Sequence, residues 1–204
     1  MSAYVILDLE MCTIPKSVRI NKKLRLKNEI IQIGAVMMNE SFEVIDQFMS
    51  YVKPQWGYVD LVIKKLTGIS SDDLENAHNV SEVLEMFAEW LPQNAILVTW
   101  SENDINQIDN EMWCKNIDIP KLYEYFTTYM DCQEIFSTKL HTTKRYRLTD
   151  ALCIAGLDYD DTNIHTALCD ASNTALLFSK TQIEEIFVLS PYYVMPNYQV
   201  AISY

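Results

Sequence analysis

The order of apolar segments along the chain constrains the fold more than any other sequence feature. Short runs rich in β-branched residues come first, and segments with helical spacing then alternate with further short runs. The expected strands cover residues 4–10, 29–38, 42–52, 95–100 and 126–130. The expected helices cover residues 61–69, 80–91, 104–114 and 167–187, with another from about 133. This order predicts an α/β fold, with a mixed, mostly parallel five-stranded sheet and helices on both faces.

The length and composition are those of a single globular domain. The chain has 204 residues, of which 49% are hydrophobic and 22% charged. We expect one domain over residues 1–204, with a core at about 4–187 and a C-terminal tail at 188–204. No segment combines a basic start with a long apolar run, and none approaches the roughly 20 apolar residues that span a bilayer. With only four glycines, the chain lacks the glycine-rich phosphate loops of many nucleotide-binding proteins.

The cysteines predict a reducing compartment. Their number is odd, they are scattered, and no two stand in a C-x-x-C arrangement; they are Cys12, Cys114, Cys132, Cys153 and Cys169. A disulfide framework or a zinc site would need paired or clustered thiols. We therefore expect free thiols, most of them buried and inert, in a cytoplasmic protein that is not attached to a membrane.

Two carboxylates at the end of the first strand are the first candidates for chemistry. Asp8 and Glu10 are two residues apart, so strand alternation places both side chains on one face of the sheet. Two such charges repel each other unless a cation, such as a divalent metal ion, lies between them. The alternative is a strand that simply runs out into solvent at this point.

Three further candidates lie beside helix starts. Asp104 follows the fourth strand, His165 precedes the last helix, and Asp170 belongs to that helix's first turn. Each also has an ordinary structural explanation. Asp104 could cap the helix that it begins, and Asp170 could interact with the helix dipole. A lone histidine is most often structural. A catalytic site is therefore indicated only by the occurrence of all these residues together.

Taken together, these motifs resemble the DEDDh exonucleases, the DnaQ-like group of the ribonuclease H-like fold. The matching pattern is Asp8-x-Glu10 in the first strand, Asp104 after the fourth, and His165-x-Ala-x-x-Asp170 at the last helix. The resemblance covers roughly residues 4–180. Segments at 8–12, 29–34, 51–54 and 66–69 look most like the Eri-type branch, which trims RNA 3′ ends.

The resemblance implies a single exonuclease domain that hydrolyses phosphodiesters with two divalent ions, Mg²⁺ or Mn²⁺. It implies that Asp8, Glu10 and Asp170 hold the ion that activates water, and that Asp8 bridges to the second ion. Asp104 would act partly through water. His165 would be the general base, since an imidazole can take up a proton near neutral pH.

Charge and aromatic residues suggest where a nucleic acid could bind. The net charge is −12, yet residues 11–28 contain six basic and no acidic residues, and residues 135–149 are also free of acids. Met11 and Cys12 stand where many relatives have Thr–Gly, next to the terminal sugar and base. The candidate substrate-binding residues are therefore Met11, Cys12, Lys22, Lys23, Arg25, Lys27, Arg145 and Arg147. Possible stacking surfaces are Trp56, Tyr58 and Tyr146, although each could equally pack in the core.

The resulting hypothesis is a metal-dependent 3′→5′ exonuclease that releases nucleoside monophosphates from single-stranded nucleic acid, with RNA favoured. Three alternatives remain open at this point. They are a DNA-directed exonuclease with the same site, a nuclease acting on free nucleotides or dinucleotides, and a non-catalytic nucleic-acid-binding module. The non-catalytic module is disfavoured because all five site residues are present. The sequence leaves the protein partners undetermined.

Overall fold

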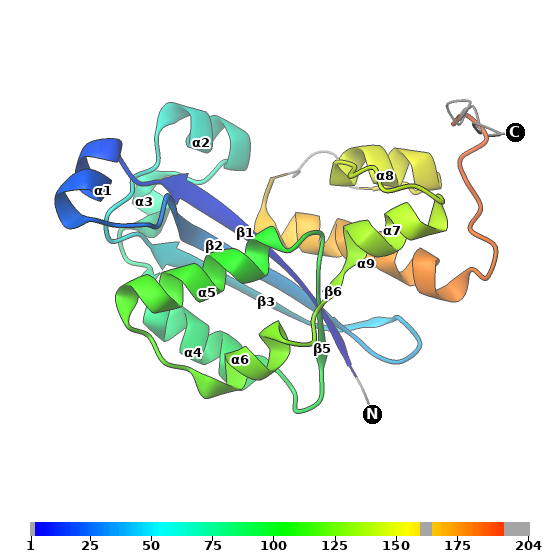
Figure 1. Cartoon of the computed structure of the whole chain (residues 1–204), viewed down its shortest axis with the longest axis horizontal. Helices are drawn as coiled ribbons and strands as arrows, with labels where there is room; N and C mark the ends of the chain where they lie inside the picture. The colour runs from blue at the N-terminus through cyan, green and yellow to red at the C-terminus, as the bar shows by residue number, and fades with distance from the viewer. Residues whose placement is uncertain (1–2, 160–164, 194–204) are drawn as a thin grey trace, which may run out of the picture.

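The computed structural model describes residues 3–159 and 165–193, and a six-stranded mixed sheet forms its centre (Figure 1). In spatial order the strands are β4, β3, β2, β1, β5 and β6. Their bounds are β1 Tyr4–Thr13, β2 Asn28–Met38, β3 Val44–Lys53, β4 His78–Asn79, β5 Ile96–Thr99 and β6 Met130–Asp131. The helices are α1 Lys16–Lys22, α2 Leu61–Thr67, α3 Ser71–Leu74, α4 Val80–Trp90, α5 Asn103–Lys115, α6 Pro120–Phe126, α7 Cys132–Lys139, α8 Leu148–Ala155 and α9 Ala167–Ile183.

The strand pairing confirms the predicted α/β class and its mixed sheet. β1, β2 and β3 form an antiparallel meander, whereas β5 pairs in parallel with both β1 and β6, and β4 pairs in parallel with β3. The sheet has six strands within the described residues instead of the five expected. The additional strand, β4, contains only two exposed residues, so it has no apolar run that a sequence pattern could reveal.

Several elements begin or end at other residues than expected: β1 continues to Thr13, and α9 ends at Ile183 instead of 187. Two further differences have identifiable reasons. The strand expected from Phe126 begins later, at Met130, because Pro120 starts a helix that continues to Phe126. Helix α4 is capped by Asn79 instead of the expected Ser81, and the Asn79 side chain accepts a hydrogen bond from the backbone of Glu82.

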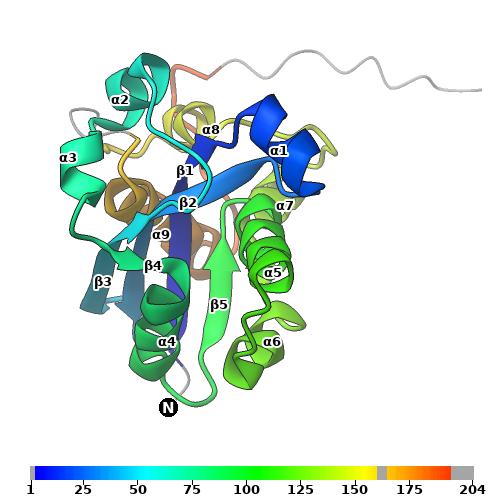
Figure 2. The ribbon, with the colours of Figure 1, turned by 90° about the vertical axis from the view of Figure 1, so that its left-hand side faces the viewer.

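Alternation along β1 assigns its side chains to two different cores. Val5, Leu7 and Leu9 pack with the apolar faces of α4, α5 and α6. Ile6 points the other way and packs with α9, through residues such as Ala171 and Phe178. Figures 1 and 2 show α9 on one face of the sheet and α4, α5 and α6 on the other. Asp8 and Glu10 continue the Ile6 series, so β1 presents both carboxylates towards α9.

The chain after α9 also packs on the molecule over the part that the structure describes. Phe187, Leu189 and Tyr193 contact the apolar cluster formed by α7 and α8. The expected C-terminal tail therefore covers a core surface up to residue 193, and residues 194–204 lie outside the described residues. None of the described helices has both the length and the hydropathy that a membrane crossing requires.

A buried group of three charged side chains joins α5 to the beginning of β2. The Nζ of Lys115 lies 2.7 Å from carboxylate oxygens of both Glu29 and Glu111, and the glutamate side chains are fully buried. Glu111 also accepts from the backbone amide of Ile30 at 3.0 Å. Glu29 accepts from the backbone amides of residues 55–57. These bonds fix the direction of α5, whose first turn carries Asp104.

We predict that Lys115→Met lowers the free energy of unfolding by about 3–5 kcal/mol, because it leaves two buried carboxylates without a cation. Burial raises the pKa of Glu111, and the Lys115 ammonium opposes that rise. Without Lys115 the folded protein holds a proton on Glu111 more tightly, so the loss of stability should be smaller at pH 5 than at pH 8.

Urea unfolding at both pH values measures this effect. Lys64→Met is the matched control, because Lys64 is exposed on α2. Equal stability of the two variants at pH 8 would show that the buried group does not hold α5 in place.

Candidate active site

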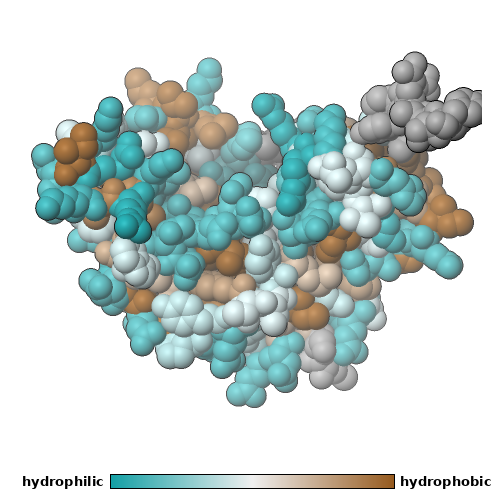
Figure 3. Space-filling view, in the orientation of Figure 1, coloured by the Kyte–Doolittle hydropathy of each residue, from teal (hydrophilic) through white to brown (hydrophobic). Residues whose placement is uncertain are grey.

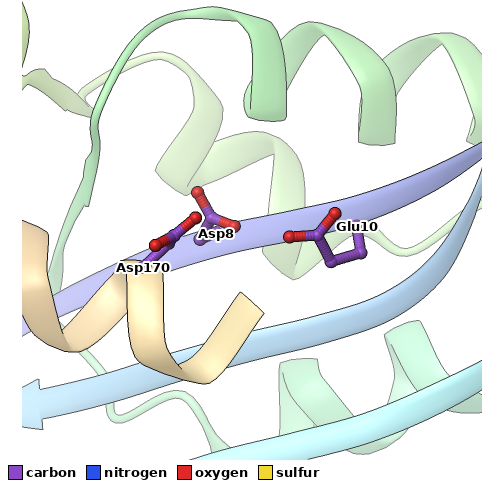
Figure 4. A group of neighbouring side chains, drawn as sticks. All are labelled: Asp8, Glu10 and Asp170. Carbon is purple, nitrogen blue, oxygen red and sulfur yellow. The ribbon is translucent and has the colours of Figure 1, made fainter. Parts of the chain in front are cut away.

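Three carboxylates from two elements far apart in sequence converge between β1 and α9 (Figure 4). Asp8 and Glu10 come from β1, and Asp170 comes from the first turn of α9. One oxygen from each of these side chains lies within 4.8 Å of the other two. The pairing of Asp8, Glu10 and Asp170 that the sequence predicted is therefore present in the fold.

The close approach of α9 to β2 creates this arrangement. Gly34 pairs with Asp8 across β1 and β2. A Cβ on Gly34 would lie 2.7 Å from the carbonyl oxygen of Ala167, nearer than real Cβ atoms come to backbone atoms. The missing side chain at Gly34 thus allows the first turn of α9 to rest directly on the strand, which brings Asp170 beside the β1 carboxylates.

Gln32 fixes the same helix end by hydrogen bonding. It pairs with Glu10 across the two strands, and its side chain is buried. Its Oε1 accepts from the Ala167 backbone amide at 2.9 Å. That amide is one of those at the start of a helix that have no partner within it, and no side chain bond from Thr166 caps α9. Gln32 therefore does the work of a cap from a neighbouring strand.

Asp104 lies at the edge of the cluster. It is the second residue of α5, is 7% exposed, and its charge raises the pKa of Asp8. It does not belong to the group of three whose oxygens lie within 4.8 Å. The capping position of α5 is held by Glu102, so Asp104 is not the capping residue, although hydrogen bonds from the backbone of Asp104 itself and of Leu9 act to lower the pKa of its carboxyl group.

The four carboxyl groups strongly favour protonation or a cation. Burial is the main cause that raises the pKa of each, to about 8 for Glu10 and about 7 for Asp104. For Asp8, the charges of Asp104, Asp170 and Glu10 add to the effect of burial. Bringing four ionised carboxylates together at neutral pH therefore requires positive charge. A set of oxygen donors with this spacing fits Mg²⁺ or Mn²⁺, which prefer such ligands.

His165 lies at the exposed rim of the cluster. It stands just before Thr166, the N-terminal capping residue of α9, and has a left-handed backbone with φ of 70°. Its charge and a hydrogen bond from its backbone both act to lower the pKa of Asp170, although burial outweighs them. The histidine is thus beside Asp170, where its imidazole can reach solvent.

The candidate substrate-binding residues have different surroundings. Met11 is half-buried beside Glu10, and Lys22, Lys23, Arg25, Lys27 and Arg147 are exposed. Arg145 is exposed too, but its guanidinium lies 2.8 Å from the Asp131 carboxylate and is partly neutralised. Its availability to a phosphate is therefore lower than that of the others.

Two residues singled out in the sequence are packing residues. The Cys12 side chain is 1% exposed and lies beneath Gly57, and burial raises its pKa to about 12. It does not reach a substrate, so the expected contact at Cys12 is dropped. Tyr146 is 8% exposed and packs edge-on against Phe136, which leaves its ring no free face for a base.

Sequence reasoning missed the roles of Gln32 and Gly34. Both lie in the segment 29–34, whose likeness to the Eri-type branch was noted without a function for either residue. A glycine and a glutamine inside an otherwise apolar strand were the available signal, because neither contributes to a hydrophobic core.

Comparison with known proteins finds an exonuclease family. The RNase T family model, described as an exonuclease, matches residues 5–178. The chain is 27% identical over 189 residues to a Danio rerio protein named ERI1 exoribonuclease 2, covering 80% of this chain but 33% of that protein. It is 28% identical over 164 residues to the DNA polymerase III subunit epsilon of Aquifex aeolicus, covering 79% of this chain and 75% of the subunit.

A solved structure shares the fold. The crystal structure of a full-length 3′-exonuclease superposes with a TM-score of 0.75 at 21% identity, covering 88% of this chain and 81% of that one. This likeness supports the arrangement of strands and helices described above. The chain spans about a third of the length of the Danio rerio relative.

We predict that the metal-free protein loses stability as pH rises from 5 to 8.5. The folded pKa of Glu10 is about 8 against an ordinary value of 4.5, so the folded state binds more protons than the unfolded state between these values. The contribution of this excess proton binding to the free energy of unfolding is largest near pH 4. It disappears as the pH passes about 8, a loss of about 2–4 kcal/mol.

Urea unfolding in EDTA at both pH values measures the loss, and Asp8→Asn should flatten the dependence. Adding Mg²⁺ should restore most stability at pH 8.5, where the ligands are ionised. A wild-type protein whose pH profile matched that of Asp8→Asn would contradict the electrostatic description.

We predict that Gly34→Ala displaces the first turn of α9 and weakens Mn²⁺ binding at least about tenfold, because a methyl group there collides with backbone atoms. Calorimetric titration with Mn²⁺ is the measurement. Gly68→Ala is the control. Its φ of 73° also strains an alanine, but a Cβ there meets no atom within 4 Å. Gly68→Ala should lower the stability without changing the Mn²⁺ affinity. Equal Mn²⁺ affinities for the two variants would show that the close approach of α9 at Gly34 does not determine metal binding.

Proposed function

This chain belongs to the RNase T family of exonucleases, and from that premise we propose that it is a 3′→5′ exonuclease acting on single-stranded nucleic acid. RNA is the proposed substrate, and nucleoside monophosphates are the proposed products. The observation that carries the proposal is the cluster of Asp8, Glu10 and Asp170, with Asp104 and His165 at its edge.

The carboxylates are the proposed ligands of two divalent ions, Mg²⁺ or Mn²⁺. Asp8, Glu10 and Asp170 would hold them, with Asp104 acting partly through water. When bound, such ions supply an activated water and stabilise the charge on the leaving oxygen. The residues themselves keep the site rigid, because Asp8 and Glu10 are paired with Gly34 and Gln32 of β2 and Asp170 is inside a helix.

His165 is the proposed general base. Its imidazole would take a proton from the attacking water as the new bond from that oxygen to phosphorus forms. The bond from phosphorus to the 3′ oxygen of the preceding nucleotide then breaks, and this oxygen takes a proton from solvent. The products are a nucleoside 5′-monophosphate and a strand with a new 3′ hydroxyl. An exposed position at the rim suits this role, since the proton can then pass to water.

The preference for RNA rests on the resemblance of segments 8–12, 29–34, 51–54 and 66–69 to the Eri-type branch. Overall identity does not separate the two nucleic acids, because an exoribonuclease and a DNA polymerase subunit are equally similar at 27% and 28%. A DNA-directed 3′→5′ exonuclease is therefore the second candidate. We keep the cytoplasm as the proposed compartment, because all five cysteines are free thiols in the structure.

The test uses 5′-labelled RNA and DNA strands of one sequence, incubated with Mg²⁺, with Mn²⁺ or with EDTA. Either ion should give a ladder that shortens from the 3′ end, faster on RNA, and EDTA or Asp8→Asn should abolish it. A 3′-phosphate should make a strand resistant, because a site that receives the terminal hydroxyl has no place for extra charge. Cuts in a circular strand, or mononucleotides released from the 5′ end, would rule the proposal out.

We predict that His165→Ala lowers the turnover rate by roughly 10²- to 10⁴-fold and leaves RNA affinity nearly unchanged, as expected for loss of a general base. Turnover at saturating RNA and binding in Ca²⁺ are measured separately. His78→Ala is the control, because His78 is an exposed histidine on β4, outside the cluster. A His165 variant with weaker binding but normal turnover would assign the residue to substrate contact instead.

A further inference from the structure

A groove lies between α1 and the C-terminal half of α5, outside the carboxylate cluster. Its volume is about 650 Å³, and its walls include Lys22, Lys23, Arg25, Trp113 and Tyr123. Figure 3 shows hydrophilic side chains gathered over α1. The groove thus combines three cations with two aromatic rings, in a protein whose net charge is −12.

The cations of the groove are not neutralised by the fold. Within the described part of the chain, Lys22, Lys23 and Arg25 form no ion pair with a carboxylate, and all three are exposed. The acidic side chain among the described lining residues is Asp118. Three unpaired cations against one acid make this a locally positive surface that attracts a polyanion, whereas most of the molecule repels one.

Trp113 gives the groove a stacking surface. It is 66% exposed, although tryptophan is usually well buried, and Tyr123 is 38% exposed nearby. The guanidinium carbon of Arg25 lies 5.9 Å from the centre of the Trp113 ring. A ring held beside a cation suits a nucleotide, because the base can stack while the arginine meets its phosphate.

Helix α5 connects this groove to the catalytic cluster. Asp104 belongs to its first turn, and Trp113 stands nine positions later. At about 1.5 Å per residue the two positions are separated by roughly 14 Å along the helix. Nine positions are about two and a half turns, so Asp104 and Trp113 face opposite sides of α5, and a strand joining them must also pass around the helix. Stacked nucleotides rise about 3.4 Å each, so at least about four of them are needed. The buried Glu29–Lys115–Glu111 group holds the same helix in place.

We propose that this groove binds the nucleotides of a single strand that precede its 3′ end by about four or more positions. A base would stack on Trp113, and the neighbouring phosphates would pair with Lys22, Lys23 and Arg25. The inference rests on the proposed function, because it takes the strand's 3′ end to be at the carboxylate cluster. It adds a second binding site on α1 and α5, which makes affinity depend on strand length.

The test measures binding by fluorescence anisotropy on the inactive Asp8→Asn protein in Mg²⁺, with labelled RNA of 3 and of 12 nucleotides. In this background Trp113→Ala should weaken binding of the 12-mer by roughly 5- to 150-fold, the usual value of one aromatic–base stack. The 3-mer is too short to reach the groove, so its affinity should not change. Trp113→Tyr should restore most of the 12-mer affinity, which separates loss of stacking from loss of folding.

Salt dependence tests the cations independently. Lys22→Ala combined with Lys23→Ala should reduce the slope of log affinity against log salt by about 1.4 for the 12-mer, since each phosphate contact on a single strand contributes about 0.7. Lys64→Ala combined with Lys65→Ala removes the same charge from exposed positions on α2 and should change the slope by less than half as much.

The outcomes distinguish the two proposals. One outcome would overturn the groove assignment alone. In that outcome the wild type degrades RNA, but Trp113→Ala leaves the affinity for the 3-mer and the 12-mer unchanged, or weakens both to the same extent. Wild type that degrades neither RNA nor DNA would overturn the proposed function, whatever Trp113 does. Equal loss of salt slope in the two lysine pairs would show general attraction to charge, which also overturns the assignment.

Discussion

The contact between the first turn of α9 and strand β2 is the constraint on which the site depends. A helix normally packs on a sheet through its side chains, which keep the two backbones apart. At Gly34 there is no side chain, so backbone atoms of Ala167 and Leu168 come directly against the strand. The Gln32 bond to Ala167 then fixes the helix end at that place. Only because α9 comes this close does a carboxylate in its first turn reach those of β1.

The packing of α9 on the sheet also keeps the three carboxylates together although they repel one another. Asp8, Glu10 and Asp170 would separate if their backbones could move, because burial and mutual charge disfavour the ionised forms. Pairing of Asp8 and Glu10 with β2, and helix formation at Asp170, restrict such movement. The sheet and helix therefore hold the carboxylates ready for cations before any arrive, which is the preorganisation that a catalytic metal site needs.

The strands and helices whose apolar residues recur at a regular spacing could be predicted from the sequence. The features that depend on single long-range contacts could not. Alternation in β1 placed Asp8 and Glu10 on one face, and the position of Asp170 in a first helical turn followed from the last apolar periodicity. The two-residue β4 and the helix at Pro120 carried too little pattern. Cys12 is buried, as expected for most of the thiols, but the sequence did not show that this burial excludes a substrate contact, because Gly57, which covers Cys12, is held there by a hydrogen bond to Glu29.

Helix α5 extends from the negatively charged carboxylate cluster to the positively charged groove. Its first turn carries Asp104, which adds negative charge to the carboxylate cluster, and its last turns carry Trp113 and Lys115. The ammonium group of Lys115 is buried and forms ion pairs with Glu29 and Glu111, so it is not available to a ligand. The free cations beside Trp113 come instead from the α1 segment, which lacks acidic residues entirely. If the proposed function holds, the groove beside Trp113 offers positive charge to a nucleic acid while the carboxylates are kept for metal ions, because the two kinds of charge are separated along one helix.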